Sequence, residues 1–139
     1  MTARGGGGRT LHPELSPADR RRLLRLGVER FNRGEFFAAH EAFEEIWRST
    51  RPEPRDLFQG LVQVSAGLHH GLDRGKPEPA RRVMARGRRR LTPLAPAACG
   101  LDLASLLAVI EAWEQWFAGA GDQPPELPAL AVLDPRMLR

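Results

Sequence analysis

The chain has 139 residues, of which 42% are hydrophobic and 27% are charged, values typical of one globular domain with a hydrophobic core. The net charge of +4 is a modest excess that does not by itself indicate a nucleic-acid-binding protein. One cysteine excludes a disulfide within the chain and fits a reducing compartment. No stretch is long and apolar enough for a membrane span or a signal peptide. We therefore expect a cytoplasmic protein without a membrane partner.

Residues 1–15 contain four consecutive glycines and no apolar periodicity, so they are predicted to form a disordered leader. A helical domain is expected over residues 16–119. Its first helix is predicted to begin at Ser16, because serine can cap a helix, a proline follows it, and Asp19 lies at the third helical position. Gly34 is expected to end this helix, as glycine commonly does.

Apolar residues at helical spacing predict four more helices. They span about residues 35–49, 56–73, 79–91 and 102–118. Proline and glycine separate them, and the segment between the last two is predicted to be a loop. Residues 120–139 form a proline-rich tail whose Leu130, Val132 and Leu133 are candidates to dock on the helices. No segment alternates like a strand, so the predicted fold class is all-α, a compact single-domain bundle of about five helices.

The second predicted helix carries polar residues at the edge of its apolar face. On a helical wheel of about 100° per residue, His40 lies at the margin of the aromatic stripe. Glu44 follows one turn later and is flanked by apolar or aromatic residues. Glu41 falls on the opposite side, which is expected to face solvent.

The third predicted helix has no charged residue between Leu57 and Leu72, which is typical of a central, buried helix. Its polar residues cluster on the side opposite its leucine stripe. Because a buried polar group without a partner costs about 1–3 kcal/mol, we expect the polar patches of the two helices to face each other. The predicted cluster contains His40, Glu41, Glu44, Gln59, Gln63 and His70.

Three interpretations of this cluster are open. His40, Glu44 and His70 are a recognised ligand set for a divalent metal, and the spacing of the first two lets both reach one ion. The second interpretation is a small-molecule or acid–base pocket, because a partly buried glutamate beside histidines can transfer protons. In the third, the cluster is a structural network that specifies helix packing. The sequence does not decide whether the protein is an enzyme, and it identifies neither a substrate nor a cofactor.

Arginines cover the face of the predicted helix 79–91 that lies opposite its apolar stripe. Such a face is usually a solvated surface. The alternative function is a non-enzymatic interaction module in which this face binds an acidic or phosphate-bearing partner. Nucleic acid is not favoured, because no aromatic residues are interleaved with these arginines. A homo-oligomer remains open, since the chain contains three tryptophans.

Two sequence blocks also carry a family resemblance. "FNRGEFFAAHEAFEEIWR" (residues 31–48) followed by "FQGLVQVSAGLHH" (residues 58–70) resembles the domain of unknown function 309 family of small prokaryotic helical proteins. The resemblance extends over about residues 28–92. It implies a small helical bundle and no activity, because none is assigned to the family. Ala38 stands where the family often has an acidic residue, and Lys76 where it usually has asparagine.

Overall fold

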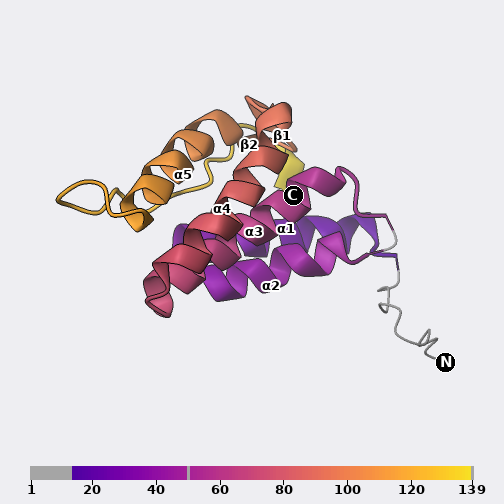
Figure 1. Cartoon of the computed structure of the whole chain (residues 1–139). Helices are drawn as coiled ribbons and strands as arrows, with labels where there is room; N and C mark the ends of the chain where they lie inside the picture. The colour runs from indigo at the N-terminus through magenta and orange to yellow at the C-terminus, as the bar shows by residue number, and fades with distance from the viewer. Residues whose placement is uncertain (1–13, 50, 139) are drawn as a thin grey trace.

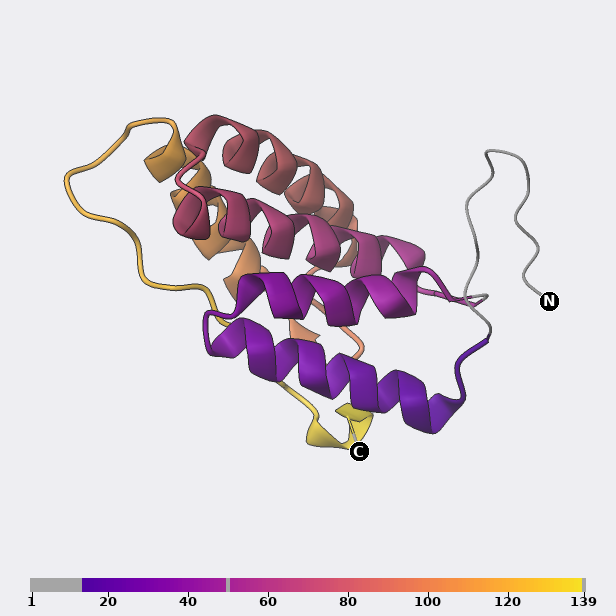
Figure 2. The same ribbon diagram turned by 90° about the horizontal axis from the view of Figure 1, so that it is seen from below.

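The computed structural model describes residues 14–49 and 51–138, which form five α-helices. They are α1 (Pro17–Asn32), α2 (Phe36–Trp47), α3 (Arg55–Leu68), α4 (Pro77–Leu91) and α5 (Leu103–Phe117). The first four lie side by side in chain order, and α5 packs against α4 (Figure 1, Figure 2). The predicted all-α bundle is confirmed. Most of the predicted leader, residues 1–13, lies outside the described residues. None of the described helices is long and apolar enough to cross a bilayer.

The helix ends follow the predicted local signals. Ser16 caps α1, because its Oγ accepts a hydrogen bond of 3.0 Å from the backbone N–H of Asp19. Gly34 follows α1 with a φ of 77°, a left-handed conformation that has no steric cost for glycine. Asp102 caps α5 in the same way as Ser16 caps α1. α4 begins at Pro77 rather than near residue 79, since a proline in the first helical turn needs no hydrogen-bond partner.

The segment between α4 and α5 differs from the predicted loop. A 3-10 turn, η2 (Thr92–Leu94), is followed by an antiparallel pair of strands, β1 (Ala97–Ala98) and β2 (Leu101–Asp102). The expectation that no strand occurs is therefore wrong in this detail, because strands of two residues are too short to show alternation. Cys99 and Gly100 form the turn, with φ values of 49° and 76°, as in a type I′ hairpin turn.

α3 is the central helix and packs against both α2 and α4. Its approach to α4 requires residues without side chains. A Cβ atom on Gly67 would lie 2.3 Å from Met84 Cγ, and one on Gly87 would lie 2.8 Å from the Gly60 carbonyl oxygen. The backbones of α3 and α4 are therefore in direct contact. The buried side chains of α3 are Leu57, Phe58, Leu61, Val64, Ser65 and Leu68.

The segment after α5 returns to the bundle and adds to its core. Leu130 is 1% exposed, and Asn32 at the end of α1 holds its backbone. Asn32 Nδ2 donates to the Leu130 carbonyl oxygen at 3.1 Å, and Asn32 Oδ1 accepts from the Leu130 N–H at 2.7 Å. Val132 pairs with Leu101, whereas Leu133 is exposed. The final 3-10 turn, η3 (Pro135–Leu138), lies against α1.

Gly87→Ala is expected to lower the free energy of unfolding by about 1–3 kcal/mol, although alanine favours helices more than glycine does. The new methyl group would meet the Gly60 carbonyl oxygen and the Val64 backbone, neither of which can move unless the helices separate. Denaturant unfolding followed by circular dichroism measures the change. Arg82→Ala, at an exposed position of the same helix, is the control and should change stability by less than about 0.5 kcal/mol. A Gly87→Ala variant as stable as the wild type would contradict the close helix contact.

Candidate functional site

The structure divides the predicted polar cluster, and its α2 part is only half-buried. The Nε2 atom of His40 lies 4.0 Å from Glu44 Oε2, and the two side chains are 21% and 32% exposed. Glu41 is exposed, as the helical wheel predicted. A shallow groove of about 190 Å³ is lined by Glu41, Glu44, Glu45 and Arg48. Glu41 and Glu44 therefore lie at the molecular surface, whereas His40 is more buried than either of them.

The end of α3 widens into a π-helix, η1 (His69–Asp73), which the sequence did not predict because its apolar pattern resembles that of an α-helix. The π-helix places His69 beside α2. The Phe37 ring centroid lies 5.1 Å from that of His69 and 5.6 Å from that of His40. His69 Nδ1 also lies 2.8 Å from Asp73 Oδ2. An aromatic contact thus joins α2 to the π-helix, a type of segment that is frequent at functional sites.

His70 lies next to this contact, with its ring centroid 6.0 Å from that of His69. Burial lowers the pKa of His70 below its ordinary value of 6.5, and the nearby His69, Arg74, Lys76 and His40 lower it further by charge repulsion. His70 is therefore a neutral imidazole near pH 7. His40 and His70 lie close enough to interact electrostatically. The Nδ1 atom of each is buried without a hydrogen-bond partner among the described residues.

Gln63 faces α4 instead of the histidines, which corrects the predicted cluster. Its Oε1 accepts a hydrogen bond of 3.2 Å from Arg90 Nε, and Arg90 Nη1 donates to Asp56 Oδ1 at 3.2 Å. Gln59 lies one turn before Gln63 and is partly buried. A helical wheel gives the direction of a side chain around its own axis, but it does not say which neighbouring helix lies in that direction.

His40, Glu44 and His70 do not form the predicted metal-ligand set in this arrangement. Within residues 14–49 and 51–138, no three histidine, cysteine, aspartate or glutamate side chains form a group that could hold a metal ion. His40 and Glu44 lie on α2, whereas His70 lies on the π-helix that follows α3. Although His40 and His70 are close enough to interact, no third side chain of this kind among the described residues completes a group with them.

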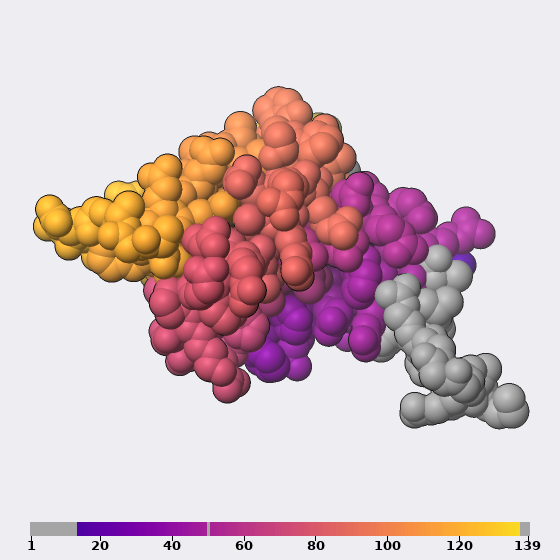
Figure 3. All heavy atoms as spheres, viewed as in Figure 1, coloured from indigo at the N-terminus to yellow at the C-terminus, as the bar shows by residue number. Residues whose placement is uncertain are grey.

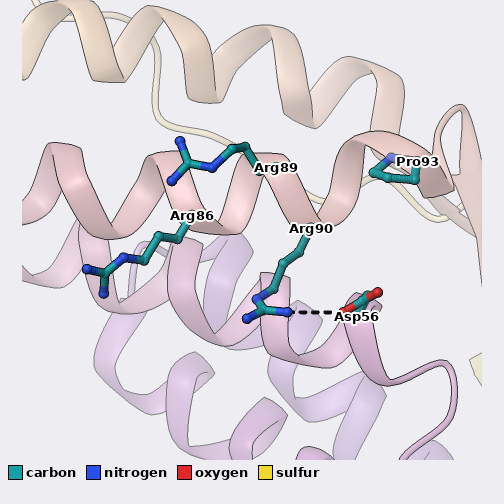
Figure 4. Close-up of a pocket in the computed structure, with 5 residues that line it drawn as sticks. All are labelled: Asp56, Arg86, Arg89, Arg90 and Pro93. Carbon is teal, nitrogen blue, oxygen red and sulfur yellow. Dashed lines mark hydrogen bonds and ion pairs between the residues drawn. The ribbon is translucent and has the colours of Figure 1, made fainter.

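A basic groove, which we call the arginine groove, lies between α4 and the start of α3. Asp56, Arg86, Arg89, Arg90 and Pro93 line its volume of about 420 Å³. Arg90 turns toward Asp56, while Arg86 and Arg89 extend from α4 without reaching it (Figure 4). Neither Arg86 nor Arg89 has a carboxylate partner in the part of the chain that the structure describes. The groove therefore carries uncompensated positive charge.

Two other arginines of α4, Arg88 and Arg81, are paired with carboxylates. Arg88 Nε and Nη2 donate to the two carboxylate oxygens of Glu114 on α5, at 2.6 and 3.1 Å. Arg81 Nη2 donates to Glu78 at 2.6 Å, and this hydrogen bond lowers the pKa of the Glu78 carboxyl below its ordinary value. Figure 3 shows α4 at the molecular surface, beside α5. Arg86 and Arg89 at the arginine groove, together with the exposed Arg82 outside it, are the α4 arginines without a carboxylate partner among the described residues.

Part of the chain matches a known protein family. A family model described as Domain of unknown function (DUF309) matches residues 24–83, which confirms the family that the sequence blocks resemble. The matched range contains all six residues of the predicted polar cluster, and it ends before the three arginines of the arginine groove. No curated protein matches the chain.

The lowered pKa of His70 leads us to expect a pH dependence of folding. At pH values below 6.5 the unfolded chain binds a proton at His70 more readily than the folded protein does. The stability that the neutral imidazole contributes is therefore complete above that value and is lost as the pH falls through the lowered pKa. Denaturant midpoints measured across this range should fall less steeply in His70→Gln than in the wild type. Identical pH profiles for the two proteins would contradict this expectation.

Proposed function

Residues 24–83 belong to the DUF309 family, and we propose that the protein is a non-enzymatic binding module whose arginine groove binds a small phosphorylated ligand. The family description assigns no activity, so the proposal depends on the groove itself. The observation that carries it is the pair Arg86 and Arg89, which extend beside an open volume of about 420 Å³ without carboxylate partners among the described residues.

The chemistry of the groove favours phosphate. A guanidinium group presents planar N–H donors that bind two phosphate oxygens at once. Arg90 is held in place by Gln63 and Asp56, so it loses little conformational freedom when a ligand binds. The volume of about 420 Å³ falls within the usual range of small-molecule sites, about 300–1,000 Å³. The lining contains no aromatic side chain on which a base could stack, which favours a small phosphorylated molecule over single-stranded nucleic acid.

His40, His69, His70 and Phe37, which we call the histidine cluster, have a structural role in this proposal. The ring contacts of Phe37 with His40 and His69 connect α2 to the π-helix. The other interpretation, a metal or small-molecule pocket at His40, Glu44 and His70, has less support because no three such side chains among the described residues form a group that could hold a metal ion. Elemental analysis of the purified protein separates the two. A stoichiometric divalent metal that is lost in His40→Ala would overturn the structural role, whereas protein without metal and an unchanged fold in that variant supports it.

Tripolyphosphate is a suitable probe of the arginine groove, with binding measured by calorimetry at low ionic strength. Each charge-assisted hydrogen bond contributes about 1.5–3 kcal/mol, and about 1.4 kcal/mol corresponds to a tenfold change in affinity. Arg86→Gln/Arg89→Gln is therefore expected to weaken binding by at least about tenfold. Arg33→Gln/Arg48→Gln removes the same charge from exposed positions outside the groove and should change the affinity by less than about twofold.

Two outcomes would contradict the proposal. Equal weakening in both double variants would mean that tripolyphosphate responds to net charge and not to the groove. Tighter binding of a single-stranded oligonucleotide than of tripolyphosphate at the same salt concentration would point to nucleic acid as the partner instead of a small ligand.

A further inference from the structure

Another cavity, of about 320 Å³, lies where the first turns of α1 meet α3 and the β1–β2 turn. It shares no lining residue with the arginine groove or with the histidine cluster. Leu24 and Phe58, which are 4% and 0% exposed, form its apolar wall together with Pro17. Arg20, Arg21 and Arg136 bring positive charge to the same cavity. We call it the α1 cavity.

Arg20 is held rigidly at this cavity. Its Nη1 donates to the Arg51 carbonyl oxygen at 2.8 Å, and its Nη2 donates to the Glu53 carbonyl oxygen. The guanidinium carbon lies 4.8 Å from the centre of the Phe58 ring, a cation–π contact. Carbonyl oxygens and a ring orient the guanidinium but do not neutralise it. The result is a positioned positive charge beside a buried aromatic ring.

The other two arginines differ in how much charge they leave available. Arg21 has no carboxylate partner among the residues that the structure covers. Arg136 is paired with Asp134, since its Nε donates to Asp134 Oδ1 at 3.0 Å. Arg20 and Arg21 are therefore the uncompensated cations of the α1 cavity.

Cys99 lies in the wall of this cavity and offers a way to observe it. Burial raises the pKa of the Cys99 thiol above its ordinary value, and the opposing effect of the Arg20 charge is smaller. The thiol is therefore protonated near neutral pH and reacts slowly. We assign it no chemical role. Because it is the only cysteine in the chain, its rate of alkylation reports on this cavity alone.

We propose that the α1 cavity binds a small organic anion. An apolar body, such as a single ring, would lie against Leu24 and Phe58, and its carboxylate or phosphate group would accept hydrogen bonds from Arg20 and Arg21. The charge selects an anion over a neutral molecule, and the apolar wall selects an organic anion over an inorganic one. This binding site is independent of the phosphate site proposed for the arginine groove.

Phenyl phosphate is a suitable probe, because it combines an apolar ring with an anionic group. At saturation it should slow alkylation of Cys99 by iodoacetamide by at least about fivefold, because it fills the space beside the thiol. Benzyl alcohol lacks the charge and inorganic phosphate lacks the ring, so each should change the rate by less than about twofold at the same concentration. Mass spectrometry of the intact protein over time measures these rates.

Arginine variants test which side chain binds the anionic group of phenyl phosphate. Arg21→Gln should raise the phenyl phosphate concentration needed for half-protection by at least about threefold, since it removes one charged donor. Arg33→Gln and the Arg86→Gln/Arg89→Gln variant should leave that concentration unchanged. Arg21 is preferred to Arg20 for this test, because Arg20 also holds the carbonyl groups of Arg51 and Glu53.

Three results would overturn the inference. The first is unchanged alkylation of Cys99 in the presence of phenyl phosphate. The second is equal protection by benzyl alcohol, which would show an apolar cavity that does not select anions. The third is an unchanged half-protection concentration in Arg21→Gln, because the charge at the rim would then play no part in binding.

Discussion

The direct backbone contact between α3 and α4 is the constraint on which the rest of the structure depends. It exists because Gly67 and Gly87 lack side chains at the points where the helices would otherwise be separated by a methyl group. With α4 on one side and α2 on the other, α3 carries no charged residue after Asp56 and buries most of its apolar side chains. The same contact brings Arg90 within hydrogen-bond distance of Gln63 and Asp56, and so builds one wall of the arginine groove.

A central helix with two neighbours must provide partners for its polar side chains in two directions. Gln63 finds its partner on α4, whereas the histidines that follow α3 lie near His40 and Phe37 on α2. The π-helix makes the second arrangement possible, because its wider turn redirects the side chains at the end of α3. The polar residues that the sequence groups together are thereby divided between two faces of one helix.

Which parts of this protein carry free positive charge depends on which arginines have carboxylate partners, and not on where arginines are most numerous. Exposed ion pairs contribute only about 0–1 kcal/mol to folding, so an arginine without a carboxylate partner costs the fold little. Arg81 and Arg88 are paired, while Arg86 and Arg89 at the arginine groove are not. At the α1 cavity, Arg20 is oriented by carbonyl groups and a ring that leave its charge intact. Although its net charge is only +4, the protein therefore has two regions suited to anions, the arginine groove and the α1 cavity.

The sequence by itself determined the helices, because caps such as Ser16 and Asp102 and the apolar stripes act over a few residues and are visible in any short window. It also placed His40 and Glu44 at the edge of the apolar face of α2 and Glu41 on its exposed side. Only the tertiary structure decided that Gln63 faces α4, that a π-helix follows α3, and that Arg20, Phe58 and Cys99 meet at one cavity. The physical reason is that side-chain periodicity encodes a direction around one helix axis, whereas the neighbour met in that direction depends on how all the helices pack together.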